Sequence, residues 1–331
     1  MNSSTHKPKV SIVMSFYNEP LQWIRFALES ILKQTFTDFE LIIVCDNPQN
    51  SEAIEYIKGL SDGRIRLLLN KENLGPTRSF NTGISASCGE YIARMDADDI
   101  ILPERLTKQV EYLDAHPEIS VCATDAHRIS PDGKIFRRSR YRKKRDQSLL
   151  LIMNSIAHPS VMYRRSLLDL RNPLYNEDFK YAQDYELWQF LTLNGYRIHM
   201  LEEALLLYRN SPQQISRVKT SEQARFFKKA HKDFVTKWLT SHCVINAEDT
   251  ADLKVMLEKC SLAYSSGHDK EHRKHLAHII YVLYFALGTY RTGYRLRYLF
   301  DRNLIAFRLR FVYSFRLLFS KKSRQNRNGF I

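Results

Sequence analysis

Short apolar runs alternate with amphipathic stretches over the first two hundred residues of the chain. Dense runs of Val, Ile, Leu and Met predict buried strands, and apolar residues spaced by three and four predict helices. The pattern predicts strands at Val10–Phe16, Leu41–Val44, Ile65–Leu69, Tyr91–Met95 and Ser120–Thr124, separated by helices at Leu21–Lys33, Ser51–Leu60, Thr77–Ala86 and Glu104–Ala115. This rhythm implies an α/β fold, in which a mostly parallel sheet carries helices on both faces.

The alternation becomes less regular after residue 125. We expect helices at Gln147–Ile156 and Gln183–Leu193, strands at Val161–Tyr163 and Arg197–Leu201, and a solvated basic loop over Gly133–Arg145. From Ser221 the sequence is helix-like, aromatic and basic, with no further strand pattern. We therefore predict one α/β domain over residues 1–218, with halves at about 9–125 and 126–218, followed by a helical region over residues 219–331.

The net charge is unusually positive for a chain whose composition is otherwise that of a folded protein. The 331 residues are 44% hydrophobic and 26% charged, with a formal net charge of +14. A balance of this size indicates an anionic partner. From Glu271 onward, thirteen Lys and Arg face only Glu271 and Asp301, which leaves +3 for the rest of the chain. The positive excess therefore belongs to the C-terminal tail.

The tail combines this charge with aromatic and aliphatic residues at short intervals. Helices of this composition lie in membrane interfaces, with the aromatic face down and Arg toward lipid phosphates. The alternative is a helical subdomain that packs on the α/β domain. Its longest apolar run, Ile279–Leu287, is far shorter than the roughly 20 residues that span a bilayer. The first nine residues also lack the apolar centre of a signal peptide, so we expect a cytoplasmic protein, peripheral at the inner face of the cell membrane.

Two common chemistries are absent from the motifs. The five cysteines are scattered and form no C-x-x-C pair, which excludes a sequence-evident zinc site or disulfide framework. The turn Ser15–Pro20, after the first predicted strand, contains no glycine. A dinucleotide-dependent oxidoreductase would place G-x-G-x-x-G there.

Three acids follow the fourth predicted strand directly. Asp96, Asp98 and Asp99 come after Tyr91–Met95, so they lie at the carboxyl end of a parallel sheet, where ligands bind in such folds. Carboxylates this close repel one another unless a cation compensates them, and a hard divalent metal prefers carboxylate and phosphate oxygens. The alternative is a solvated acidic turn that caps the next helix.

The same region resembles a known family. The resemblance rests on ordered landmarks, namely Asn73-Leu74-Gly75, Arg78, Asn81, Gly83-Ile84, Gly89-Glu90-Tyr91, Asp96-Ala97-Asp98-Asp99, Pro103 and Arg105-Leu106. Together with the opening strand and turn at Ser11–Asn18, they are similar to family 2 inverting glycosyltransferases of the GT-A fold. The resemblance covers about Lys9 to Ser216. It implies a Rossmann-like GT-A domain followed by the helical C-terminal appendage.

The resemblance implies a role for each matching donor-side residue. Asn18 and Glu19 would border the nucleotide, and Asp46 would help to hold its base. Asp96 would meet the ribose or the metal, and Asp98 would be the main ligand of a divalent metal, Mn or Mg. Arg78 would approach the diphosphate, because a guanidinium matches phosphate oxygens. A salt bridge on the helix surface is the alternative for that residue.

The chain departs from the family pattern at three positions. Members show two acids followed by Gly-Ser where this chain has Cys45-Asp46-Asn47-Pro48, so one acid is lost. Gln183 replaces the Glu of the acceptor-side Glu-Asp pair, and Asn210 follows Arg209 where many members have an Arg-x-His element. These departures bear on base recognition, acceptor handling and the last contacts to the metal.

The implied catalytic base is Asp184. Inverting transfer needs one carboxylate to take the proton from the acceptor hydroxyl while that oxygen attacks the sugar. Asp184 resembles the family's Asp at the start of an acceptor-side helix, with Glu186 and Asp178 as substitutes. A helix N-terminal acid stabilised by the dipole is the alternative. His158 resembles a pocket-lining residue, and a buried structural histidine is the alternative there.

The resemblance as a whole implies transfer of a hexosyl or N-acetylhexosaminyl group from a nucleotide sugar, with UDP as the expected nucleotide. The acceptor would be a saccharide or a polyprenyl-linked saccharide in capsule, O-antigen or exopolysaccharide synthesis. Two alternatives remain open. A catalytically impaired scaffold would explain the three departures, and a nucleic-acid binder would explain the basic tail but leave the acidic cluster without a role. We expect no nucleic acid as partner.

Overall fold

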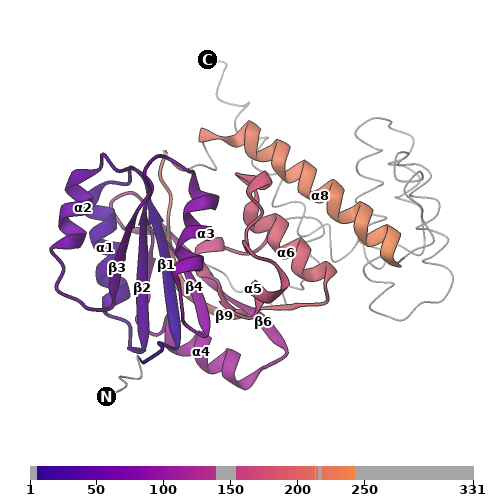
Figure 1. Ribbon diagram of the computed structural model, residues 1–331, viewed down its shortest axis with the longest axis horizontal. Helices are drawn as coiled ribbons and strands as arrows, with labels where there is room; N and C mark the ends of the chain where they lie inside the picture. The colour runs from indigo at the N-terminus through magenta and orange to yellow at the C-terminus, as the bar shows by residue number, and fades with distance from the viewer. Residues whose placement is uncertain (1–5, 139–153, 213, 215–217, 243–331) are drawn as a thin grey trace, which may run out of the picture. The chain divides into compact units, whose positions relative to one another are not determined.

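The computed structural model describes residues 6–138, 154–212, 214 and 218–242 (Figure 1). Most of the predicted helix Gln147–Ile156, the basic run beyond residue 138 and the tail with its predicted membrane role lie outside these residues. Residues 1–234 form one compact unit, and the second unit begins at Val235. The predicted domain boundary at residue 218 stays a prediction.

The predicted strands and helices of the first half are all present. In chain order they are β1 Val10–Phe16, α1 Leu21–Leu32, β2 Phe39–Cys45, α2 Ser51–Lys58, β3 Ile65–Leu69, α3 Pro76–Ala86 and β4 Tyr91–Asp96. Local signals explain the helix starts. The Asn50 side chain accepts a hydrogen bond from the Ala53 amide at the start of α2. Gly75, with φ +84°, precedes α3, and Pro76 occupies its first position.

The strands of this half form a parallel sheet in the order β3-β2-β1-β4. Successive strands are added on one side of β1 as far as β3, and β4 is then added on its other side. The order in which strands are added to the sheet therefore reverses between β1 and β4. Open α/β sheets bind ligands at such a switch point. The prediction of parallel strands is confirmed for this half.

The second half of the sheet is mixed rather than parallel. It contains β5 Ile100–Ile101, α4 Arg105–Ala115, β6 Ile119–Ile129, β7 Ile135–Arg137, the 3₁₀ turn η2 His158–Ser160, β8 Met162–Arg164, α5 Leu167–Leu170, the 3₁₀ turn η3 Glu177–Phe179, α6 Gln183–Leu193, β9 Arg197–Arg209 and α8 Thr220–His242. The full order is β3-β2-β1-β4-β8-β6-β9-β5, with β7 beside β6. Strand β8 runs antiparallel to both β4 and β6, whereas β6 and β9 are parallel. Periodicity predicts strands but not their direction, which long-range pairing decides.

Strand β9 is much longer than the predicted Arg197–Leu201. Exposed acids at Glu202 and Glu203 interrupt the apolar pattern, so the sequence signal ends there. In the fold, β9 continues beside β6 through register shifts around Asp125, and Lys108 pairs with Glu203. The continuation carries the end of the strand to Arg209, at the edge of the sheet that holds the acidic cluster.

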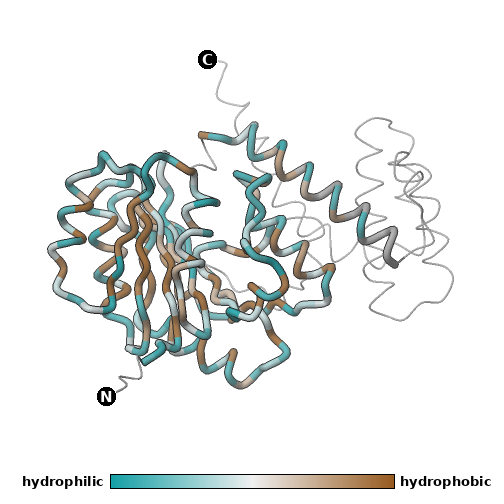
Figure 2. Tube along the Cα trace, in the orientation of Figure 1, coloured by the Kyte–Doolittle hydropathy of each residue, from teal (hydrophilic) through white to brown (hydrophobic). Residues whose placement is uncertain are grey.

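Helices cover both faces of the sheet, as predicted (Figure 1). On one face the side chains of Val10, Ile12, Met14 and Phe16 pack with α1, α2 and α4. The alternate residue Val13 faces the other side, where α3 and α6 pack. Figure 2 shows the result as largely apolar central strands among helices in which hydrophobic and hydrophilic residues alternate.

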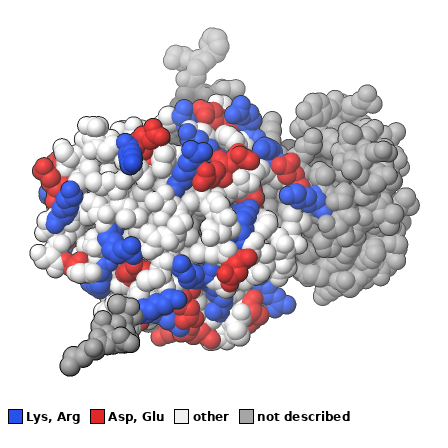
Figure 3. Space-filling view, viewed as in Figure 1, with Lys and Arg blue, Asp and Glu red and all other residues white. Residues whose placement is uncertain are grey.

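The face of the described residues that Figure 3 shows carries both positive and negative side chains. In Figure 3, basic and acidic side chains alternate over the visible face without a large patch of one sign. This distribution agrees with the near balance of charges before residue 271. Among the helices that the structure describes, none is both long and apolar enough to cross a bilayer.

Gly89 allows β4 to begin directly against β1. Its amide donates to Ser11 Oγ at 2.7 Å, and a Cβ on this residue would lie 2.5 Å from the Ser11 amide nitrogen. Because backbone atoms cannot move aside cheaply, Gly89→Ala should lower the free energy of unfolding by about 3 kcal/mol, the upper end for overpacking. Urea unfolding measures this loss.

Gly63→Ala is the matched control, because no atom lies within 4 Å of a Cβ at that position. It should change the free energy of unfolding by less than about 0.5 kcal/mol. Equal stability of the two variants would contradict the close approach at Gly89.

Candidate functional site

The carboxyl ends of three parallel strands meet at one edge of the sheet. Ser15 of β1 lies opposite Asp96 of β4, and Phe16 lies opposite Cys45 of β2. The segments that follow these strands therefore lie at a common edge, beside the β1/β4 switch point. The predicted donor-side residues come from these segments: Asn18 and Glu19, Asp46, and Asp96 with Asp98.

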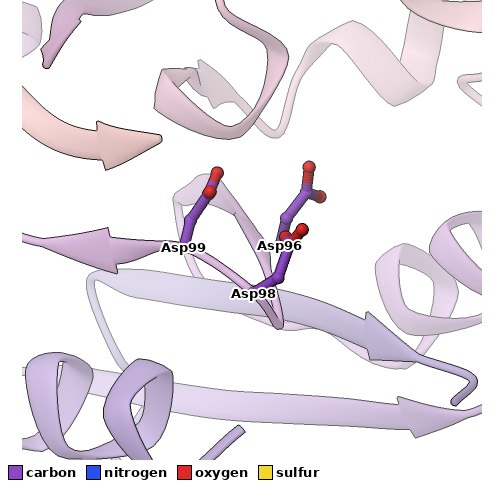
Figure 4. Close-up of side chains that lie close together, drawn as sticks. All are labelled: Asp96, Asp98 and Asp99. Carbon is purple, nitrogen blue, oxygen red and sulfur yellow. The ribbon is translucent and has the colours of Figure 1, made fainter. Parts of the chain in front are cut away.

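Asp96, Asp98 and Asp99 form a tight carboxylate cluster. One oxygen from each lies within 4.8 Å of the others, and Figure 4 shows the three side chains close together at the end of β4. Burial, reinforced by the charges of Asp96 and Glu19, raises the pKa of Asp98 to about 7. Burial beside the other two acids raises the pKa of Asp99 well above its usual range. The cluster therefore resists carrying its full negative charge without a cation.

The cluster fits a hard divalent cation. All of its donor atoms are carboxylate oxygens, the type that Mg and Mn prefer. Asp99 Oδ2 is buried and accepts no hydrogen bond from the described residues, so this oxygen of the cluster has no protein donor there. Asp96 and Asp98, the predicted metal ligands, are both partly exposed and therefore open to an ion. The residues thus match the predicted cofactor.

Arg209 ties the acidic turn to the end of β9. Its backbone amide donates to Asp99 Oδ1 at 2.8 Å, and its Nε donates to the Asp98 carbonyl at 2.7 Å. Its Nη1 donates to the Pro131 carbonyl at 2.8 Å in the turn after β6. In the sequence, Arg209 drew attention only because the histidine of the family's Arg-x-His element is missing after it. Its role in holding the turn depends on the unpredicted extension of β9.

Arg94 is a buried cation inside β4 that sequence reasoning did not select. Its Nη2 and Nε donate to Asp96 Oδ1 at 2.7 and 3.2 Å, and its guanidinium lies 3.9 Å from the ring centre of Phe80. The signal was present, because Arg94 is the one charged residue within the buried run Tyr91–Met95. A charge inside a buried strand needs a partner, and here Asp96 supplies it.

Asp46 organises the loop that leads into α3. It is 4% exposed, and its oxygens accept hydrogen bonds from the Asn70 side chain at 2.8 Å and from the Leu74 and Gly75 amides at 2.9 Å. These bonds fix the backbone on one side of the predicted nucleotide site. The role of Asp46 in holding the base stays a prediction.

The turn after β1 places Asn18 and Glu19 beside the same edge. Asn18 Oδ1 accepts a hydrogen bond from Asn47 Nδ2 at 2.6 Å, which joins the loops after β1 and β2. Glu19 Oε2 accepts from the Tyr17 amide at 2.7 Å. Burial raises the pKa of Glu19, and the charge of Asp96 adds to this effect. Glu19 is therefore a fourth acid that acts on the cluster.

Arg78 makes the surface ion pair that was the alternative to a diphosphate contact. Its Nε donates to Glu177 Oε2 at 2.8 Å, and 59% of its side chain is exposed. The next turn of α3 makes a further link, because Asn81 Nδ2 donates to the Tyr175 carbonyl at 2.9 Å. The described contacts give Arg78 a role in joining α3 to the acceptor-side loop, and its contact with a diphosphate stays a prediction.

Asp184 lies in the first turn of α6, as predicted. Asp184 Oδ2 accepts a hydrogen bond from Asn154 Nδ2 at 2.6 Å. Burial raises the pKa of Asp184, although this hydrogen bond and the positive charge of Arg94 oppose the change. Asn154 was not selected from the sequence, because an amide outside any motif gives no signal.

Glu186 and Asp178, the two alternative candidates for the catalytic base, have different surroundings. Glu186 is held by Arg171, whose Nη1 and Nη2 donate to its two oxygens at 2.8 and 2.9 Å. Asp178 lies in η3 and is exposed. His158 is 8% exposed and contacts Arg94 and Tyr175, so it belongs to a buried network, and its place in the acceptor pocket stays a prediction.

Comparisons with known proteins agree with this geometry. The sequence profile described as "Glycosyl transferase family 2" matches residues 11–171. An uncharacterized glycosyltransferase of Methanocaldococcus jannaschii is 36% identical over 228 residues, which cover 67% of this chain and 78% of that protein. The O-antigen biosynthesis glycosyltransferase WbnJ of Escherichia coli is 28% identical over 205 residues, covering 60% and 79% of the two chains.

The fold is shared with a solved structure. The mannosyltransferase PcManGT from Pyrobaculum calidifontis, solved with GDP-Man and Mn²⁺, superposes with a TM-score of 0.53 at 19% identity and covers 96% of this chain and 89% of its own. The mixed sheet with helices on both faces is therefore that of GT-A enzymes, as the sequence predicted. With the identity to the M. jannaschii relative and the profile match, these findings show that the chain belongs to glycosyl transferase family 2.

Proposed function

We propose that the chain is a metal-dependent inverting glycosyltransferase that moves a sugar from a nucleotide-diphosphate sugar to a saccharide hydroxyl. The observation that carries the proposal is the carboxylate cluster of Asp96, Asp98 and Asp99 at the β1/β4 switch point. A solvated acidic turn would leave its carboxylates in water, whereas Asp99 is 1% exposed and the pKa of Asp98 is raised to about 7. A site of this kind is better explained by a bound cation than by surface charge.

On the donor side, Asp96 and Asp98 would hold the divalent ion, and Arg209 keeps their turn in place. When bound, a divalent cation stabilises the charge that develops on a diphosphate leaving group. Asn18 and Asp46 would border the nucleotide from the loops after β1 and β2. Their hydrogen bonds to neighbouring loops leave these side chains in defined positions before a donor arrives.

On the acceptor side, Asp184 would act as the general base. It takes the proton of the acceptor hydroxyl while that oxygen forms a bond to the anomeric carbon. The bond from this carbon to the diphosphate oxygen breaks in the same displacement, so the sugar inverts and the nucleotide diphosphate leaves. A pKa raised by burial brings a carboxylate closer to neutral pH, where it accepts a proton more readily.

The expected donor is a UDP-sugar that carries a hexose or an N-acetylhexosamine, by family resemblance. The expected acceptor is a saccharide or a polyprenyl-linked saccharide. Two comparisons support the broader class of these substrates: the E. coli relative is named an O-antigen biosynthesis glycosyltransferase, and the P. calidifontis neighbour was solved with Mn²⁺ and a nucleotide sugar, GDP-Man. We propose that this chain acts in surface-polysaccharide assembly at the inner face of the cell membrane.

Thermal unfolding with nucleotide sugars and Mn²⁺ or Mg²⁺ tests the donor side. The matching donor with its metal should raise the melting temperature of the chain, because both bind only the folded state. Asp98→Asn should abolish this rise and lower transfer by at least about a hundredfold, which corresponds to several kcal/mol of lost stabilisation. Without metal the variant should melt no lower than the native chain at pH 8, since the carboxylate with a pKa of about 7 is replaced by a neutral amide.

Asp62→Asn is the control for this experiment. Asp62 pairs with Arg64 at 2.7 Å in the loop before β3, at the opposite edge of the sheet. This variant should keep the full metal-dependent rise. A native chain that shows no rise with any nucleotide sugar and metal, and no transfer, would overturn the proposed function.

Asp184→Asn tests the base. Donor-dependent stabilisation should be unchanged, whereas turnover should fall by about 10² to 10⁴, the usual contribution of a general base. The stability of the Asp184→Asn variant should not fall with its turnover, and at pH 8 it should equal or exceed that of the native chain. Because the folded chain holds the Asp184 proton more tightly than the unfolded chain does, ionisation at rising pH costs stability in the native protein only. The melting temperature of the variant should therefore equal or exceed the native value at pH 8, and this advantage should vanish toward pH 4.

Glu186→Gln provides the matched control on the same helix. It breaks the ion pair with Arg171, so it should lower the melting temperature and leave turnover within a few-fold of the native rate. Near-normal turnover in Asp184→Asn, with a large loss in Glu186→Gln, would assign the base to Glu186 instead.

A further inference from the structure

Arg209 is the meeting point of three segments at the edge of the sheet that holds the carboxylate cluster. The residue is fully buried, with 0% of its surface exposed. Its Nε donates to the Asp98 carbonyl at 2.7 Å, and its Nη1 donates to the Pro131 carbonyl at 2.8 Å. Its guanidinium carbon lies 5.2 Å from the ring centre of Trp23, which is within the range of a cation–π contact. Arg209 therefore contacts the acidic turn, the turn between β6 and β7, and helix α1.

Trp23 supports this arrangement from the side of α1. Its Nε1 donates to the Pro131 carbonyl at 3.2 Å, so this one oxygen accepts hydrogen bonds from both Trp23 and Arg209. Trp23 lies in the first turn of α1, where its amide donates to the Pro20 carbonyl at 2.8 Å. The indole therefore connects the start of α1 with the turn on which Arg209 rests.

The side chain of Arg209 holds backbone atoms rather than acids. Its Nε and Nη1 donate to the carbonyls of Asp98, Ser130 and Pro131, and its Nη2 is buried without a partner among the described residues. A planar guanidinium fixes the directions of its N–H groups, so these bonds set the position of the Asp98 backbone. The backbone amide of the same residue donates to Asp99 Oδ1 at 2.8 Å. Arg209 thus holds the acidic turn at two points.

The charge of Arg209 does not explain its place beside a cation site. A guanidinium repels a divalent ion, so charge alone would make Arg209 weaken the binding of a metal. The contacts of Arg209 have the opposite effect, because they hold the Asp98 backbone and the Asp99 carboxylate in place while the acids repel one another. The two effects have opposite signs on metal affinity, so an experiment can separate them.

We propose that Trp23 and Arg209 are positioning residues of the metal site, and that with the Pro131 carbonyl they form a clamp on the acidic turn. Arg209 acts through the turn itself, and Trp23 acts through Pro131 and Arg209. This inference rests on the metal site of the proposed function. It adds helix α1 to the parts of the fold on which that site depends.

Calorimetric titration of the full chain with Mn²⁺, alone and in the presence of UDP, tests the clamp through metal affinity. Arg209→Met should weaken Mn²⁺ binding by about 10- to 100-fold, the usual cost of losing a contact that orients a metal ligand. Trp23→Leu changes no charge and should also weaken binding. Tighter binding in Arg209→Met would show that charge is its main effect, and the proposal would be wrong. Unchanged affinity in Trp23→Leu would overturn it as well.

Trp23→Phe is a milder variant for the same titration. It keeps an aromatic face beneath Arg209 and removes only the N–H donor to Pro131, so its loss of affinity should be smaller than that of Trp23→Leu. Should Arg209→Met fail to fold, these two Trp23 variants decide the question. A Trp23→Phe variant that binds Mn²⁺ more weakly than Trp23→Leu would contradict the proposed order of contacts.

Hydrogen exchange measured by mass spectrometry in EDTA tests the clamp without metal or nucleotide. In Trp23→Leu, the peptide that spans Asp96 to Leu102 should exchange faster than in the native chain, because its turn loses support. A peptide from β2 should keep its native exchange. Faster exchange throughout the domain would indicate general destabilisation and contradict a local clamp, and native exchange at the turn would contradict any clamp.

Two control variants remove similar contacts elsewhere. Arg164, like Arg209, donates to backbone carbonyls, from Nη2 and Nε at 2.6 and 2.9 Å, but it lies beside the start of β4. Tyr56, like Trp23, lies beneath an arginine, because the guanidinium carbon of Arg25 is 4.6 Å from its ring centre. Arg164→Met and Tyr56→Leu should lower stability and leave both the Mn²⁺ affinity and the exchange of the acidic turn unchanged.

The two measurements also separate the clamp from the proposed function. Faster exchange of the acidic turn in Trp23→Leu, in a chain that binds no Mn²⁺ with or without UDP, would support the clamp and refute the metal-dependent function. Native Mn²⁺ binding that no clamp variant alters would refute the clamp alone.

Discussion

The repulsion among carboxylates at the end of β4 is the interaction on which the rest of the site depends. Asp96, Asp98 and Asp99 lie in one turn, and burial prevents water from screening them fully. The surrounding structure counters this repulsion with Arg94 from inside the strand and Arg209 from β9. These contacts do not offset the whole negative charge of the cluster, and the proposed divalent cation would compensate the remainder.

The two halves of the domain are joined through the same groups. Strand β9 starts in the mixed part of the sheet and ends on the acidic turn, where Arg209 connects this turn to the one that follows β6. Helix α3 makes a second connection, because Arg78 and Asn81 hold the loop that contains Glu177 and precedes α6. The parallel half that holds the carboxylate cluster and the mixed half that carries Asp184 are therefore joined by direct contacts.

The agreement between sequence and fold is greatest where local chemistry decides. Gly89 and Gly75 were landmarks of the resemblance, and the fold explains both. The backbone at Gly89 lies too close to Ser11 for a Cβ, and Gly75 has a left-handed φ just before α3. The agreement is weakest where partners are distant. Glu202 and Glu203 hid the second half of β9, and the direction of β8 depends on pairing with β4 and β6, which no local pattern encodes.

The sequence by itself determined the order of strands and helices in the parallel half, the family, and the placement of Asp96, Asp98 and Asp184 at element ends, because periodicity and motif spacing are local properties of the chain. Only the tertiary structure decided what stands beside these acids. Arg94, Arg209 and Asn154 reach them from other elements or from inside a buried strand. Charge compensation depends on distance in space, and residues far apart in sequence become neighbours only when the strands pair and the helices pack on the sheet.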